Sequence, residues 1–282
     1  MEFFSTIFDQ NFSFIRNTIV LSIISSIPIG IVGTFVVVNR MSYIAGAISH
    51  SVLGGIGIAI YLSTVFETSL ITPSLGGLIF ATLSGLIISL FYLWGRERVD
   101  TAISAVWIIG MSIGIIFAYF TPRYTDLSSY LFGNILLVSV EDVWYVVLIS
   151  LVVLTVVSLF FHQLVLVSFD KDFSITRGIN PKLLLTILIL LISLTVFLMV
   201  KIVGTILAIA LITLPSAISN MFSKRISAII LSSILIAMLS QLLGLFISFE
   251  LDIPTGVTIT ILLGAGYILT LLSRGLVKLR NY

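Results

Sequence analysis

Uncharged apolar runs follow one another along almost the whole chain, and short segments between them carry most of the charged residues. A helix needs about 20 apolar residues to cross a hydrocarbon core of about 30 Å. Nine runs are long enough to do so: 17–39, 41–66, 68–95, 101–122, 143–169, 183–200, 202–223, 226–249 and 253–273. Most are apolar around their whole circumference, which indicates helices packed in a bundle.

Two further segments complete the predicted topology. The apolar run 127–140 is too short for a perpendicular span, which predicts a re-entrant or interfacial element. Residues 1–16 carry aromatic side chains at helical spacing and are expected to lie along the membrane face. The sequence therefore predicts an all-α polytopic membrane protein, with one domain over 1–282 and about nine transmembrane helices, eight to ten in range.

Composition supports this class of protein. Of the 282 residues, 59% are hydrophobic and only 9% are charged, whereas soluble domains carry about 25% charged residues. Membrane lipids are therefore the expected surroundings. The net charge of +2 is too small for nucleic acid to be an expected partner. The absence of cysteine excludes disulfides and thiolate metal sites.

The sequence lacks the motifs of several common enzyme classes. It contains no GxxxxGK[ST] phosphate loop, so any use of ATP requires a separate subunit. It also lacks an HExxH pair, a GxSxG elbow and paired acids within a span. We therefore expect a transport subunit with no permanently bound cofactor rather than an enzyme.

The lysines and arginines predict the orientation, because positive loops are retained in the cytoplasm. With the N-terminus outside and nine spans, 11 of the 14 basic residues lie inside, and only Arg16, Arg123 and Lys201 lie outside. This predicts an N-out, C-in topology. The same arrangement puts eight of the 12 acidic residues outside. They either form an acidic mouth that concentrates cations or collect there because the bases are held inside.

The run from Met41 to Tyr61 contains His50, its only side chain that changes charge near neutral pH. A helix that starts near Met41 puts His50 about 13 Å deep, near the middle of the core. A polar group at that depth usually faces a bundle interior or a water-filled path. His50, with Ser49, Ser51, Gly54 and Gly55, is therefore a candidate ion path. The alternative is that the glycines only pack, beside a histidine bonded to a neighbouring helix.

Three other features concern helix packing. Gly110 and Gly114 form a GxxxG motif, which favours close contact between helices. Pro215 is expected to kink or break its span, because proline removes one helical hydrogen bond. His162 is expected at the membrane interface, near the inner end of the span 143–169.

The longest predicted cytoplasmic connection is 168–182. Ser168 or Asp170 is expected to cap a short helix that ends near Gly178, with Asn180-Pro181 closing the turn. Such a helix is suited to docking a cytoplasmic partner. The alternative is an ordinary solvated loop.

Five segments together resemble the permease subunits of ABC transporters that import zinc, manganese or iron, the ABC-3 type. They are RMSYIAGAISHSVLGGIGIA at 40–59, LSSYLFGNILLVSVEDV at 127–143, FDKDFSITRGIN at 169–180, VGTILAIALITLPSAISN at 203–220 and LDIPTGVTITILL at 251–263. They occur in the family's order over nearly the whole chain.

The resemblance implies a type II ABC importer bundle in a bacterial cytoplasmic (inner) membrane. It also implies a homodimer, cytoplasmic ATP-binding cassette subunits and an extracellular metal-binding protein. The segment 168–182 would be the coupling loop that docks on the ATPase, through Asp170, Asp172, Phe173, Arg177 and Gly178. His50 matches a family position that lines the ion path.

One position departs from the family pattern. Many members carry an aspartate four residues before the histidine, where this chain has Gly46. Metal would then be held by His50 with water, Ser49, Ser51 or backbone carbonyls. Loss of a carboxylate is expected to favour zinc over manganese, because zinc accepts imidazole well.

Two other functions stay open at this stage. The first is a permease for an organic metal chelate of the siderophore or cobalamin type. The second is a carrier working alone or a membrane enzyme, although no span carries an acidic side chain for ion coupling.

The orientation can be tested directly, because the chain has no native cysteine. We expect Ser5→Cys to react with a membrane-impermeant maleimide added to intact cells, and Asn281→Cys to react only after permeabilisation. Labelling of Ser5→Cys only from the cytoplasm would contradict the N-out, C-in topology.

Overall fold

The computed structural model describes residues 13–94, 99–122, 130–131 and 139–280. The elements assigned in these residues are α-helices: α2 (Ser13–Val38), α3 (Ser42–Val65), α4 (Pro73–Trp94), α5 (Val99–Phe120), α7 (Val140–Phe169), α8 (Lys171–Thr176), α9 (Pro181–Phe222), α10 (Ile226–Leu251) and α11 (Thr255–Arg280). Eight of them are long and apolar enough to cross a membrane. This confirms the predicted all-α polytopic fold.

Two predicted elements fall on residues that the structure does not describe. The interfacial segment 1–16 lies outside the described residues except for its last four positions, which belong to α2. Most of the run 127–140 also lies outside them. The N-out, C-in orientation stays a prediction.

The longest helix, α9, contains two of the predicted spans. It covers 42 residues, with a break at Gly204, where φ is 82° and ψ is 170°. Only glycine adopts this backbone conformation readily. The predicted spans 183–200 and 202–223 are therefore two arms of one broken helix. Because α9 counts as one candidate span, the described residues contain eight candidate spans rather than the nine expected.

Pro215 was expected to kink or break its span, and the structure shows no break there. Backbone dihedrals stay helical through Pro215, which is buried inside the second arm of α9. The proline ring fixes φ near −65°, a value that a helix accepts, so only one hydrogen bond is lost. Packing holds the helix here, since α2 approaches the α9 backbone at Gly33 so closely that a Cβ there would lie against the Ile212 carbonyl.

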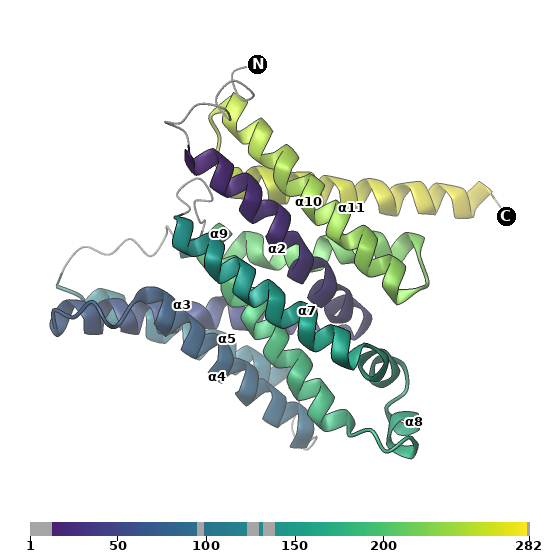
Figure 1. Cartoon of the computed structure of the whole chain (residues 1–282), viewed down its shortest axis with the longest axis horizontal. Coiled ribbons are helices and arrows are strands. Elements are labelled where there is room, and N and C mark those ends of the chain that lie inside the picture. The colour runs from purple at the N-terminus through teal and green to yellow at the C-terminus, as the bar shows by residue number, and fades with distance from the viewer. Residues whose placement is uncertain (1–12, 95–98, 123–129, 132–138, 281–282) are drawn as a thin grey trace.

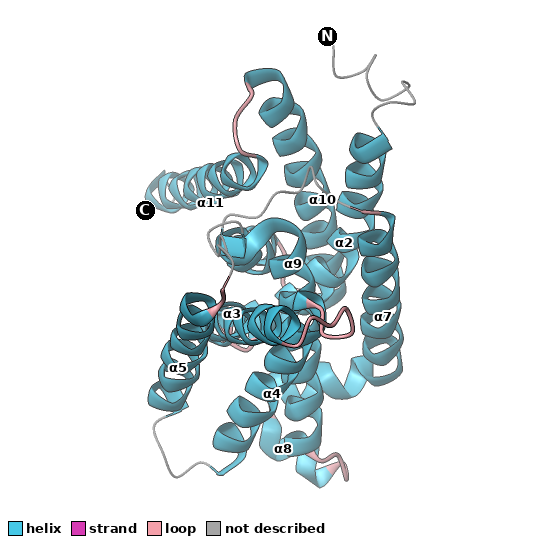
Figure 2. Cartoon of the chain, turned by 90° about the vertical axis from the view of Figure 1, so that its left-hand side faces the viewer, coloured by secondary structure: helices cyan, strands magenta, loops and turns pink. Residues whose placement is uncertain are grey.

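The core of the bundle lies around α9 and α3. The helix α9 packs against α2, α3, α4, α7, α10 and α11. Figure 2 shows α3 between α9 on one side and α4 and α5 on the other, and these three helices are its main contacts. The C-terminal part of α11 extends away from the other helices (Figure 1). This arrangement surrounds α3, the helix that carries His50.

Glycines on both helices bring α3 and α5 into direct backbone contact. A Cβ at Gly110 would lie 2.6 Å from Ser51 Cα, and a Cβ at Gly114 would lie 2.5 Å from Leu53 O. From the α3 side, a Cβ at Gly54 would lie 2.5 Å from Gly110 O. The GxxxG motif is thus confirmed as a helix contact.

We expect Gly110→Ala to lower the thermal midpoint of the purified protein in detergent. The added methyl group overlaps the α3 backbone, and overpacking of this kind costs about 1–3 kcal/mol. Gly264→Ala on α11 is the matched control, because a Cβ there meets no atom within 4 Å. Equal midpoints for the two variants would contradict the role of this contact.

Candidate functional site

His50 is the ninth of the 24 residues of α3 and is half-buried. Its imidazole stacks on the indole of Trp107 in α5, with ring centroids 4.7 Å apart and planes within 8°. Its Nδ1 is buried and has no hydrogen-bond partner among the described residues. Nε2 is therefore the ring nitrogen that is left to meet an ion.

Gly46 lies one helical turn before His50 and is buried. A Cβ at this position would lie 3.8 Å from Ile209 Cδ1 and 4.0 Å from Trp107 Cζ3, which is ordinary van der Waals contact. Ile209 belongs to the second arm of α9. The surroundings of His50 and Gly46 are thus built by three segments, and a Cβ at position 46 fits without a clash.

The described part of one chain does not supply a complete metal site. It contains no group of three His, Cys, Asp or Glu side chains placed to share an ion. Zinc sites usually have at least three protein ligands. An ion at His50 therefore needs further ligands from water, backbone carbonyls or another chain.

The other predicted path residues are engaged in contacts within the chain. Ser49 and Ser51 are buried, and their hydroxyl groups donate to Gly46 O (2.8 Å) and Ile48 O (2.9 Å). Ser51 also bonds Ser84 of α4 at 2.8 Å. Gly54 packs on Gly110 of α5, and a Cβ at Gly55 would overlap the backbone of α4. The structure thus brings His50 together with Trp107, which no motif in the sequence singled out.

A second polar group lies between α7 and the first arm of α9. Lys201 Nζ is 2.8 Å from Asp142 Oδ1 and 3.8 Å from the ring centroid of Tyr145. The two charged side chains border a cavity of about 210 Å³ that is also lined by Tyr130 and Ser74. Because the lysine already neutralises the carboxylate, this group is not a ready cation site. Only the predicted outside location of both residues hinted at it from the sequence.

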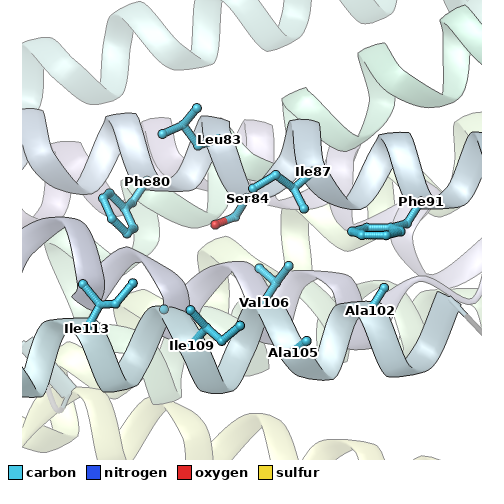
Figure 3. A pocket seen from close by; sticks show the side chains of 11 residues that line it. Phe80, Leu83, Ser84, Ile87, Phe91, Ala102, Ala105, Val106, Ile109 and Ile113 are labelled. Atoms are coloured by element: carbon cyan, nitrogen blue, oxygen red, sulfur yellow. The ribbon is translucent and has the colours of Figure 1, made fainter.

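An apolar cavity of about 390 Å³ lies between α4 and α5 (Figure 3). Its walls are almost entirely hydrocarbon, with Phe80, Ile87 and Phe91 on α4 facing Val106 and Ile109 on α5. The one side-chain oxygen there belongs to Ser84, which is already bonded to Ser51. The cavity therefore offers no ligand set for a metal ion.

The short helix predicted in the segment 168–182 is confirmed as α8. Asp170 is its N-cap, and the carboxylate accepts a hydrogen bond from Phe173 N at 2.8 Å. Gly178 follows with φ 73°, and its N–H bonds Ile175 O at 2.9 Å. Asn180 then caps α9, with Pro181 as the first helical residue. Ser168, the other expected cap, instead bonds Leu164 O within α7.

The surface of α8 carries both apolar and charged side chains that are exposed. Phe173 and Ile175 are 43% and 58% exposed. The Arg177 guanidinium lies 5.2 Å from the Phe173 ring centroid. Lys171 Nζ bonds Tyr92 OH at 3.2 Å, which connects α8 to α4. Asp172 lies in the first turn, where its charge suits the helix dipole.

Comparison with known proteins gives one consistent result. A model of the ABC 3 transport family matches residues 11–274. The "Probable metal transport system membrane protein" of Chlamydia pneumoniae is 34% identical over 244 residues, 86% of this chain and 83% of that protein. The manganese import system permease protein ScaB of Streptococcus gordonii is 32% identical over 254 residues, 89% of this chain and 88% of that protein.

A solved structure agrees with these relatives. PsaBC from Streptococcus pneumoniae, in complex with Fab, superposes with a TM-score of 0.81 at 29% identity, over 95% of this chain and 94% of that chain. Relatives of this kind do not favour the organic-chelate alternative, and they are transporter permeases rather than enzymes.

Eight apolar helices and these relatives make the chain a multi-pass protein of the bacterial inner membrane. The chain belongs to the ABC 3 transport family, as the permease subunit of an ABC metal importer whose ATPase is a separate subunit.

Proposed function

We propose that two copies of this chain form the path of an ATP-driven importer for a divalent transition-metal ion, with His50 as the metal ligand of each copy. An extracellular metal-binding protein would deliver the ion to the outer mouth. One observation carries the proposal: a half-buried imidazole on α3, a helix long and apolar enough to span a membrane and packed against α4, α5 and α9. A polar ring inside such a bundle is costly and usually serves a function.

A homodimer would supply metal ligands that one chain lacks. One chain offers a single imidazole at this depth, so two copies facing each other would offer two, and water or carbonyl oxygens would complete the set. A site with few protein ligands binds its ion weakly, so the binding is reversible. Conduction requires such binding, because the ion must be able to leave the site as well as enter it. A sparse site thus suits transport.

Zinc is the favoured ion on the chemistry of the donors. Imidazole without carboxylate suits zinc, whereas manganese prefers carboxylate, carbonyl and water oxygens. The hydroxyl groups of Ser49 and Ser51 are weak substitutes, because both already donate to backbone carbonyls. Manganese is the second candidate, and the relative in Streptococcus gordonii, a manganese import permease by name, supports it.

The helix α8 would transmit the ATPase cycle to the path. Phe173 and Arg177 offer an exposed surface for docking, while Asp170 and Gly178 fix the two ends of the helix. The Lys171–Tyr92 bond would pass movement of α8 to α4, which packs on α3. ATP binding on the partner could thereby shift the helix that carries His50.

The first test is uptake of radioactive zinc and manganese in cells that lack their own importers, with the ATPase and the binding protein co-expressed. We expect His50→Ala to lower uptake at least about tenfold, since even the loss of outer-shell partners costs that much. His162→Ala, at the exposed second histidine on α7, is the matched control and should transport normally. Full uptake by His50→Ala at normal membrane levels would contradict the proposed site.

The second test concerns the choice of metal. We expect Gly46→Asp to raise manganese uptake relative to zinc, because the carboxylate would lie one turn from His50 and a Cβ at position 46 makes only ordinary van der Waals contacts. Gly46→Asn has nearly the same size and no charge, so it separates ligand chemistry from packing. An unchanged ratio of the two metals in Gly46→Asp would show that the missing carboxylate does not set selectivity.

A further inference from the structure

Histidines that bind metal are normally held by a second bond. The ring nitrogen away from the metal donates to a carboxylate, a carbonyl oxygen or water, and this bond fixes the direction of the ring. Nδ1 of His50 has no such partner among the described residues. The orientation of the imidazole must therefore come from packing.

Trp107 supplies that packing. Its indole lies parallel to the imidazole, with centroids 4.7 Å apart and an interplanar angle of 8°. The backbone that carries the indole is held close to α3, because Gly110, one turn further along α5, keeps the two helix backbones in contact, while the indole itself is 39% exposed. Figure 2 shows α3 and α5 as neighbours in the bundle. The stack thus joins two helices that cannot easily separate.

The same indole also borders the position of the missing aspartate. Trp107 Cζ3 would lie 4.0 Å from a Cβ at Gly46, and Ile209 Cδ1 would lie 3.8 Å from it. An apolar wall therefore stands beside His50 at the place where a carboxylate would otherwise approach.

We propose that Trp107 is a positioning residue that fixes the ring plane of His50 and so sets the direction in which Nε2 meets the ion. The stack replaces the missing hydrogen bond at Nδ1. This inference rests on the proposed function, because it matters only if His50 binds the transported ion.

Loss of the indole should weaken ion binding rather than slow the transport cycle. Without the stack, the imidazole can rotate about its χ2 bond, so Nε2 spends less time in the binding direction. A phenyl ring keeps a flat face in the same place, whereas a leucine side chain does not. Rescue by an aromatic residue therefore separates positioning from simple filling of space.

The test measures the concentration dependence of zinc uptake by the complete transporter. We expect Trp107→Leu to raise the apparent KM about tenfold, as the loss of outer-shell partners does, with nearly the same maximal rate. Trp107→Phe should restore most of the affinity. Trp144→Leu is the matched control, because Trp144 is 69% exposed on α7 and should tolerate the change.

The outcomes separate this inference from the proposed function. If His50→Ala abolishes uptake while Trp107→Leu keeps the normal KM, the positioning role is wrong and His50 still stands as the ligand. If His50→Ala transports normally, the proposed site itself is wrong. If Trp107→Leu and Trp107→Phe lower the amount of protein or the maximal rate equally, Trp107 only fills space.

A spectroscopic measurement does not depend on transport. In the purified full-length permease with Trp94→Phe and Trp144→Phe, Trp107 is the only tryptophan. Co²⁺ is paramagnetic, and imidazole binds it more tightly than Mn²⁺. We expect Co²⁺ to quench the Trp107 emission saturably, and His50→Ala to remove this quenching. Emission that Co²⁺ leaves unchanged would contradict an ion beside the stacked rings.

Discussion

In hydrocarbon every polar group has to find its hydrogen-bond partner within the protein, and this constraint governs the whole chain. Helices satisfy the backbone, and serines within the spans follow the same rule by donating to carbonyls of their own helix. Ser49 and Ser51 bond Gly46 O and Ile48 O in this way. Among the described residues, the buried polar side-chain atoms without a partner are the hydroxyl groups of Ser22, Ser216 and Ser233 and the Nδ1 of His50, and His50 is the one imidazole among them.

Close contact between helices builds the surroundings of this histidine. Apolar side chains cannot drive helices together in lipid, so small residues and tight packing must do so. Gly54 on α3 and Gly110 on α5 let the two backbones touch, and the same contact places Trp107 against His50. At Gly204 the chain changes direction, and the second arm of α9 then brings Ile209 beside Gly46.

The segment between α7 and α9 follows different rules, because most of its side chains are exposed. The short helix α8 depends on local capping, with Asp170 at its start and Gly178 at its end. Its contact with α4, through Lys171 and Tyr92, connects α8 to a helix that packs on α3. The two ends of this connection are the exposed side chains of α8 and the half-buried imidazole of His50.

The sequence by itself determined the fold class, most of the spans and the ends of α8. A long apolar run in lipid forms a helix, because a helix satisfies its own backbone hydrogen bonds, and helix caps depend on residues adjacent in the chain. The sequence also singled out His50 as a candidate, because it is the one histidine in its span. It misplaced the break of α9 at Pro215, since proline fits a helix and the conformation of Gly204 depends on how both arms pack. Only the tertiary structure could decide that Trp107 covers His50, because the two rings lie on different helices and meet through the α3–α5 contact.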